Sequence, residues 1–190
     1  MNKLPNFNIE TKGEISLEFL KRNMLTFHQA ITYIQKLPYG RNADKDNLST
    51  VFIDNKGTCS TKHALLKQVA DENNFNEMQL ILGIFRMNAQ NTFKIAKTLK
   101  EYNLEYIPEA HNYLKYKGKI FDFTRMNSSA TDFATDLVYE IDIKPSEINQ
   151  TKIQIHKNFL IDWLNENPNI TYSLNEIWSI REQCIKDLSE

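Results

Sequence analysis

The feature that most restricts the fold is a pair of alternating segments on either side of Lys117-Gly118. AHNYLKY precedes this dipeptide and KIFDFT follows it, and apolar side chains alternate with polar ones in both. Alternation with a period of two is typical of a β-strand, and a Gly-containing pair between two such runs is typical of a tight turn. We therefore expect an antiparallel hairpin over Ala110–Thr124, in which the numbers of paired residues sum to 235.

The rest of the chain carries further helix and strand signals, namely apolar residues at three- and four-residue spacings and short β-branched runs. Ser173-x-x-Glu176 is a capping box that opens the last helix. We expect helices over Ser16–Lys36, from Cys59 or Ser60 to Asp71, over Asn91–Glu101, over Ser146–Asn165 and over 173–188. Strands are expected over Thr50–Asp54, Met78–Met87 and Leu137–Ile143, and a loop is expected over Tyr102–Glu109.

These elements predict one α+β domain over residues 1–190, with a core over about 50–124. An antiparallel sheet would pack against the helix that begins near Cys59, with additional helices at both ends. The chain has 11 Phe, 8 Tyr and 2 Trp, which are enough large side chains for an apolar core. It shows neither an internal repeat nor a Gly/Ser-rich linker.

Charge and hydropathy exclude several classes of partner. Lys and Arg number 23 against 24 Asp and Glu, so the chain lacks the cation surplus that nucleic-acid binding needs. Lys115, Lys117 and Lys119 fit a solvated hairpin tip better than an RNA site. The longest apolar run, Leu80–Phe85, is far too short to span a membrane, and the first twenty residues contain no apolar leader. We expect a cytoplasmic protein without nucleic-acid or membrane partners, and the sequence indicates no oligomeric state.

The two cysteines stand in different sequence contexts. Cys184, His156 and His28 each lie on an apolar helix stripe, which favours burial in the core. Cys59 instead follows Gly57-Thr58 and opens a helix, where unpaired N–H groups and a partial positive charge stabilise a thiolate and lower the thiol pKa. The same N–H groups can donate to an oxyanion. The alternative for Cys59 is a small residue at a helix cap.

The hairpin adds a second pair of candidates. With pairs summing to 235, Asp122 lies opposite Tyr113 and His111 lies opposite Thr124, so the four side chains project to one face. His111 and Asp122 are then diagonal neighbours, close enough for a carboxylate to accept an imidazole N–H. A slip of one residue would separate them. The alternative is a surface hairpin in which His111 has no role.

The segment GTCSTKHALL around Cys59, the AHNYLKY strand with His111 and the KGKIFDFT strand with Asp122 resemble the transglutaminase-like cysteine peptidase superfamily. The resemblance covers about residues 50–124 and implies a papain-related α+β fold. It implies that Cys59 is the nucleophile, His111 the base and Asp122 the group that orients the imidazole.

The resemblance leaves the oxyanion hole half assigned. The backbone N–H of Cys59 would form one half, but Ile53 stands six residues before Cys59, where papain-like enzymes have Gln. Candidates for the second donor are Asn42, Gln35 and Tyr39. His63, Tyr113 and Thr124 are expected to surround the triad as supporting polar groups.

Three functions follow from these patterns. The first is a thiol-dependent acyl-transfer enzyme that hydrolyses a peptide, a protein or a small amide, without a metal or other cofactor. The second is a catalytically silent binding or scaffold protein on the same fold. The third is a small metal-binding regulator through Cys59 and His63, although a zinc site needs two further ligands that the sequence does not supply.

Overall fold

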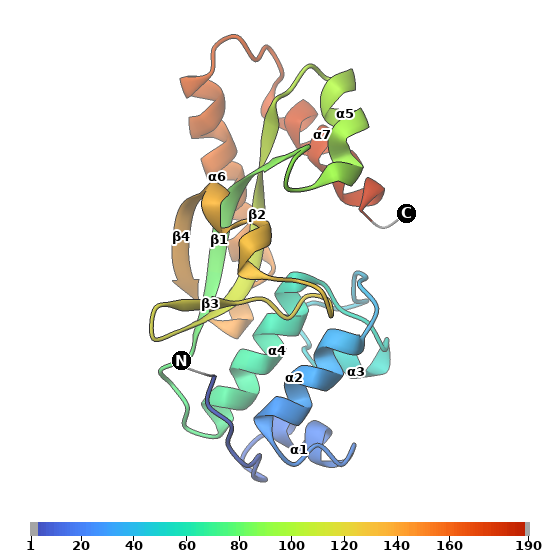
Figure 1. Ribbon diagram of the computed structural model, residues 1–190, viewed down its shortest axis with the longest axis vertical. Coiled ribbons are helices and arrows are strands. Elements are labelled where there is room, and N and C mark those ends of the chain that lie inside the picture. Colours follow the sequence, from blue (N-terminus) through green and yellow to red (C-terminus); the bar gives the residue numbers. More distant parts are fainter. Residues whose placement is uncertain (1–3, 189–190) are drawn as a thin grey trace. The chain divides into compact units, whose positions relative to one another are not determined.

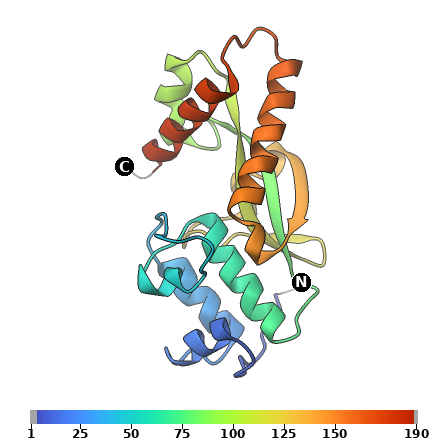
Figure 2. The ribbon, with the colours of Figure 1, turned by 180° about the vertical axis from the view of Figure 1, so that it is seen from behind.

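The computed structural model describes residues 4–188 and confirms the α+β class (Figure 1; Figure 2). Its described helices are α1 (Glu14–Leu20), α2 (Phe27–Lys36), α3 (Thr50–Ile53), α4 (Cys59–Glu72), α5 (Ala96–Glu101), α6 (Gln150–Glu166) and α7 (Leu174–Asp187). Strands β1 (Gln79–Asn88), β2 (Tyr106–Tyr116), β3 (Lys119–Phe121) and β4 (Leu137–Ile143) form an antiparallel sheet in the order β3-β2-β1-β4. Within residues 4–188, no helix combines the length and apolar character that crossing a membrane requires.

The chain divides into two compact units. The first unit comprises Met1–Leu82, Asn112–Ala130 and Ile141–Asn149, and the second comprises Gly83–His111, Thr131–Glu140 and Gln150–Glu190. Strands β1, β2 and β4 contribute residues to both units, because three of the divisions fall inside these strands. The units are described separately below.

Helix α4 is the centre of the first unit. Ten of its fourteen residues are buried, and α1 and α2 pack against it. Near its end, the Glu72 carboxylate accepts hydrogen bonds from the backbone N–H groups of Ile15 and Ser16, at 3.3 and 2.7 Å, in the first turn of α1. Gly13 permits this approach, because a Cβ at that position would lie 2.1 Å from the Glu72 carboxyl carbon. A helix terminus that would otherwise leave N–H groups unpaired is thereby satisfied.

The prediction of a single helix over Ser16–Lys36 is wrong. The chain forms α1 and α2, and Asn23 between them has a positive φ of 59°. The Thr26 side chain accepts from the Gln29 N–H and the Gln29 side chain accepts from the Thr26 N–H, which starts a new helix. A left-handed residue followed by a capping box ends one helix and begins another, although the apolar spacing continues across both.

The prediction of a strand over Thr50–Asp54 is also wrong, because these residues form the short helix α3. The Thr50 hydroxyl donates to the backbone oxygens of Asp44 and Asn47, at 2.6 and 2.7 Å. The helical turn buries Val51 and Phe52, and the Phe52 ring meets the Phe19 ring edge-on at 5.1 Å. Tertiary burial therefore overrides the β-propensity of this segment.

The hairpin register is confirmed over Leu114–Tyr116 and Lys119–Phe121, whereas the predicted pairs of Tyr113 with Asp122 and of His111 with Thr124 lie beyond β3. Leu114 pairs with Phe121 and Tyr116 pairs with Lys119, so paired numbers sum to 235. Lys117 and Gly118 have φ of 48° and 75°, the two left-handed residues that a two-residue hairpin turn requires. Two bounds differ from the prediction. β2 already begins at Tyr106, inside the expected loop, and β3 ends at Phe121, so Asp122 follows the strand.

Other boundaries agree well with the sequence. β4 spans the predicted Leu137–Ile143, α4 begins at Cys59, and the capping box of Ser173 and Glu176 opens α7. Burial confirms that His156 and Cys184 belong to the core, whereas His28 is exposed and the prediction of its burial is wrong. The helix predicted over Ser146–Asn165 is a 3-10 turn, η4 (Pro145–Glu147), followed by α6.

The second unit contains a buried ion pair between β2 and α7. Arg181 Nε donates to the Glu109 carboxylate at 2.7 Å and Arg181 Nη2 donates to it at 2.5 Å. Burial by itself would raise the pKa of Glu109, but the guanidinium beside it lowers the pKa overall. The folded-state pKa therefore lies below the ordinary 4.5, and the stability that the pair contributes is present above that pH and is lost as the pH falls further.

We expect Arg181→Met to destabilise the second unit by about 3–5 kcal/mol, because it leaves the Glu109 carboxylate buried without its cation. Urea unfolding followed by tryptophan fluorescence measures this, since Trp163 and Trp178 both lie in the second unit. Glu182→Gln is the matched control: it removes the other carboxylate bound to Arg181, which is more exposed, and should cost under about 1 kcal/mol. Equal losses in the two variants would contradict the assigned role of the pair.

Candidate active site

Cys59 is the first residue of α4, as the sequence predicts. Thr58 caps the helix by accepting from the Thr61 N–H, and the Thr61 hydroxyl accepts from the Thr58 N–H at 2.9 Å. The Cys59 side chain is 8% exposed. Gly57 lets the chain enter the helix closely packed, because a Cβ there would lie 2.9 Å from Lys62 Cγ. The thiol therefore lies at the positive end of a fourteen-residue helix.

The residues around the start of α4 are polar although they are buried. Ser60 Oγ lies 3.9 Å from Cys59 Sγ and donates to Asn112 Oδ1 at 2.9 Å. Asn112 Nδ2 in turn donates to the Ile81 carbonyl at 3.1 Å. These bonds connect the first turn of α4 with β2 and β1 inside the first unit. Buried polar side chains with complete hydrogen bonds form a rigid environment.

His63 joins α4 to the segment after β3. Its Nδ1 lies 2.8 Å from the Cys59 carbonyl oxygen, and its Nε2 accepts from the Phe123 N–H at 2.7 Å. A backbone N–H can only donate, so the neutral tautomer with its hydrogen on Nδ1 satisfies both bonds. Both ring nitrogens are therefore committed to backbone groups, which favours a structural role over metal binding. Within residues 4–188, no group of three or more His, Cys, Asp or Glu side chains is placed to hold a metal ion.

Asp122 lies beside His63 in a tight turn. Its Oδ1 accepts from the Thr124 N–H at 2.8 Å and from the Thr124 hydroxyl at 2.6 Å, and lies 3.5 Å from His63 Nε2. A side chain that accepts from the N–H two residues later fixes its own rotamer. The structure thus brings Asp122 together with two of the predicted supporting residues, Thr124 and His63. The third, Tyr113, is fully buried in β2.

His111 is the last residue of Gly83–His111, one of the three segments that make up the second unit. Its half-buried ring meets the Phe133 ring edge-on at 4.8 Å and the Phe85 ring at 6.4 Å. Cys59 and Asp122 belong to the first unit. The grouping of His111 with these two residues into a triad stays a prediction.

The candidates for the second oxyanion donor have different surroundings. Asn42 Nδ2 donates to the Lys56 carbonyl at 2.9 Å and to Asp54 at 3.3 Å, so both amide hydrogens have acceptors. Tyr39 forms a bridge with Gly57, two residues before Cys59, and its ring lies 4.7 Å from the Arg125 guanidinium. Gln35 is half-buried on α2. Their oxyanion role stays a prediction.

Lys62 is a central residue that the sequence analysis missed. Its side chain is fully buried, and Nζ donates to the carbonyl oxygens of Leu37 and Thr124, at 2.6 and 2.7 Å. Burial lowers its pKa from 10.5 to about 8; nearby Arg125 lowers it as well, while Asp122 and Cys59 act in the opposite direction. A signal was present, because Lys62 lies on the same helix stripe as Leu65, Leu66 and Val69.

The comparisons with known proteins identify no relative of the chain. Neither a protein-family model, nor a curated protein, nor a solved structure matches the chain.

We expect His63→Ala to destabilise the first unit by about 2–4 kcal/mol, because the Phe123 N–H loses its acceptor and the fully buried ring leaves a cavity. Urea unfolding followed by circular dichroism measures the loss, and tryptophan fluorescence reports the second unit separately. His28→Ala removes an exposed imidazole and should change the free energy of unfolding by less than about 0.5 kcal/mol. A stable His63→Ala protein would show that the ring is not a structural link.

The pKa of Lys62 predicts how stability depends on pH. Because its folded-state pKa of about 8 lies below the unfolded 10.5, the unfolded chain binds more protons between these values. The wild-type free energy of unfolding should therefore rise relative to that of Lys62→Met as the pH rises from 8 to 10.5, by up to about 3 kcal/mol. Groups that do not interact with Lys62 cancel in this difference. A difference independent of pH would mean that the ammonium is not penalised in the folded state.

Proposed function

We propose that the chain is a thiol-dependent acyl-transfer enzyme that hydrolyses a peptide or related amide through Cys59, His111 and Asp122. The observation that carries the proposal is the position of Cys59, at the first residue of a capped helix and beside buried polar side chains. Its assignment to the transglutaminase-like superfamily belongs to the same proposal and rests on the motifs in the sequence.

The surroundings of Cys59 favour a thiolate. The N–H groups of the first turn of α4 carry partial positive charge, and the Lys62 ammonium three residues later interacts electrostatically with the sulfur. Cys184 shows the opposite case, because burial, with Asp187 and Glu109 nearby, raises the pKa of its thiol to about 12. The chain thus holds one cysteine suited to nucleophilic attack and one suited to packing.

The proposed reaction has two steps. His111 takes the proton of Cys59, and the sulfur attacks the amide carbonyl to give a tetrahedral oxyanion stabilised by the Cys59 N–H. His111 then protonates the leaving amine, the C–N bond breaks, and a thioester remains. Water, deprotonated by His111, attacks the thioester and releases the acid and the free thiol. Asp122 keeps the imidazole oriented throughout.

Alkylation by iodoacetamide near neutral pH tests the nucleophile. We expect Cys59 to react at least about tenfold faster than Cys184 in the folded protein, as followed by mass spectrometry of the two peptides. His111→Ala should slow Cys59 by about tenfold, whereas His28→Ala, which removes an exposed imidazole, should leave the rate unchanged. Equal, slow labelling of both cysteines would refute the enzyme and favour the binding or scaffold protein.

An activated ester separates catalysis from a merely reactive thiol. With p-nitrophenyl acetate, the wild type should form an acetyl-Cys59 thioester that then hydrolyses. In His111→Ala the thioester should persist once formed, because the residue that activates water is absent. A wild-type thioester as long-lived as that of the variant would show that the protein does not turn over.

A further inference from the structure

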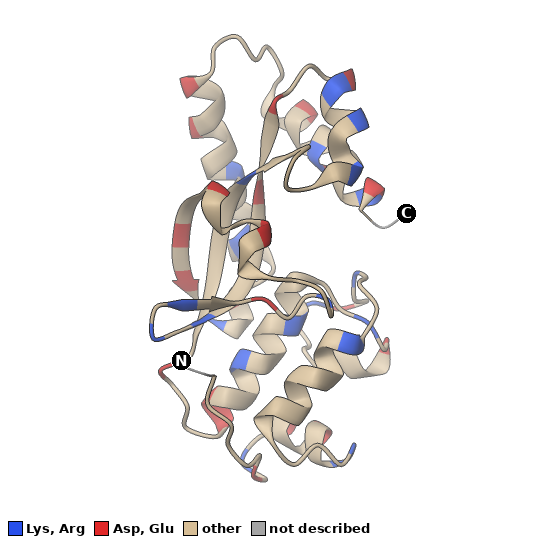
Figure 3. Ribbon diagram, viewed as in Figure 1, with Lys and Arg blue, Asp and Glu red and all other residues tan. Residues whose placement is uncertain are grey.

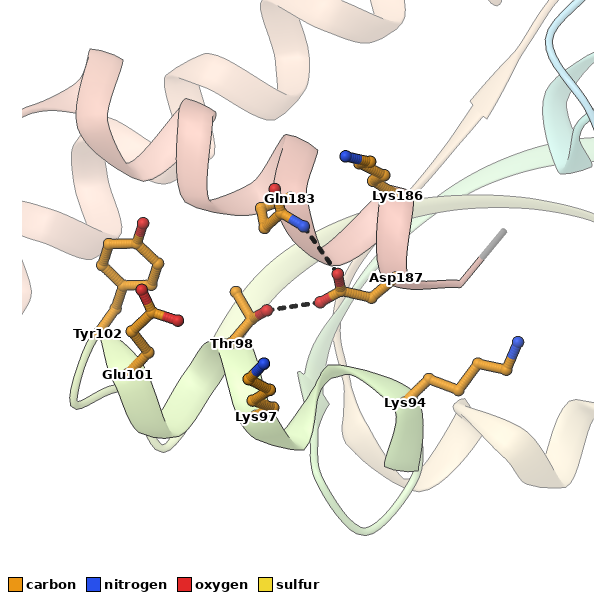
Figure 4. A pocket seen from close by; sticks show the side chains of 8 residues that line it. All are labelled: Lys94, Lys97, Thr98, Glu101, Tyr102, Gln183, Lys186 and Asp187. Atoms are coloured by element: carbon orange, nitrogen blue, oxygen red, sulfur yellow. Dashed lines mark hydrogen bonds between the residues drawn. The ribbon is translucent and has the colours of Figure 1, made fainter. Parts of the chain in front are cut away.

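The second unit contains a pocket between α7 and the segment formed by η1 (Phe93–Ile95) and α5 (Figure 4). Its volume is about 590 Å³. Pockets of about 300–1,000 Å³ are the usual size for small-molecule sites. All of its lining residues belong to the second unit. The pocket is therefore separate in the chain from Cys59 and Asp122.

Three cationic side chains line the pocket, namely Lys94 from η1, Lys97 from α5 and Lys186 from α7 (Figure 3 shows the charged residues on the ribbon). All three are exposed. Within the described residues 4–188, none of their ammonium groups forms an ion pair or hydrogen bond. The lining also contains two carboxylates, Glu101 and Asp187, so the three lysines leave a net charge of +1 around the pocket, which favours an anion.

The carboxylate at the middle of the pocket, Asp187, accepts its hydrogen bonds from neutral side chains and, among the residues that the structure describes, forms no ion pair with these lysines. Asp187 Oδ2 accepts from the buried Thr98 hydroxyl at 2.5 Å, and Asp187 Oδ1 accepts from Gln183 Nε2 at 2.8 Å. Figure 4 shows these two bonds at the middle of the pocket. Both carboxylate oxygens are thus occupied by neutral donors, which hold α5 and α7 together and leave the lysines available.

The two ends of the pocket differ in chemistry. Lys94 and Lys186 lie toward one end in Figure 4, and Glu101 and Tyr102 lie toward the other. The cationic end suits a phosphate group, and the carboxylate and phenol at the opposite end suit the hydroxyl groups of a neutral body.

We propose that this pocket binds a small phosphate monoester with a hydroxylated body. Lys94, Lys97 and Lys186 contact the phosphate. The Glu101 carboxylate accepts hydrogen bonds from the hydroxyl groups of the body, and the Tyr102 phenol exchanges hydrogen bonds with them. A sugar phosphate and a nucleoside monophosphate share this chemistry. The proposal does not depend on the reaction assigned to Cys59.

Isothermal titration calorimetry of the full chain tests the site, with glucose 6-phosphate and AMP as the two probes. Glucose, adenosine and inorganic phosphate are their controls. We expect saturable binding of at least one ester, with at least about tenfold weaker binding of its unphosphorylated body and of inorganic phosphate. The probe that binds more tightly identifies the body as sugar or nucleoside.

Variants then assign the binding to the pocket. Lys97→Ala/Lys186→Ala should weaken the ester by at least about tenfold, since two charge-assisted contacts are lost. Lys100→Ala is the matched control, because Lys100 is exposed on the same helix but does not line the pocket, and it should change the affinity less than about twofold. These lysines are exposed, so the variants should fold. Absence of saturable binding, binding matched by inorganic phosphate, or an equal loss in Lys100→Ala would each overturn the proposal.

Discussion

The buried ammonium group of Lys62 holds together the part of the first unit in which Cys59 lies. It donates hydrogen bonds to the carbonyl oxygens of Leu37 and Thr124. One side chain of α4 therefore holds two segments, namely the residues just before the bridge between Tyr39 and Gly57 and the residues just after Asp122. A lysine is almost never fully buried without partners, and a cation in the first turn of a helix opposes the helix dipole. Two carbonyl oxygens, with Asp122 and Cys59 nearby, offset part of these costs, and the pKa of Lys62 is still lowered overall.

The same arrangement explains why the polar residues around α4 have one conformation. Thr58 and Thr61 satisfy the helix start, His63 connects the Cys59 carbonyl to the Phe123 N–H, and Asp122 is fixed by Thr124. Most of these groups are buried, so a change at one group leaves another unpaired at a cost of about 1–3 kcal/mol. A thiol in such surroundings is held rigidly, which nucleophilic catalysis requires.

The sequence predicts those features whose causes are local. The Lys117-Gly118 turn sets the register of its own hairpin, and Thr58 caps the helix that begins at Cys59. It fails where distant residues decide. The segment Thr50–Ile53 is helical because Thr50, Val51 and Phe52 are buried in the first unit. Lys62 is buried because two carbonyl groups, 25 and 62 positions away, accept its hydrogens. Periodicity shows that Lys62 lies on an apolar stripe but does not show which acceptors meet it.

The two cysteines of the chain differ in the electrostatic surroundings of their sulfur atoms. Cys184 is packed on α7 with Asp187 and Glu109 nearby, and both burial and negative charge oppose its ionisation. Cys59 is nearly as buried, at 8% exposed, but its neighbours are the N–H groups of a helix start, a hydroxyl and a buried cation. Burial therefore does not distinguish the two thiols of this chain. The sign of the local electrostatic field distinguishes them, because the field at a helix N-terminus favours the anion and the field beside carboxylates does not.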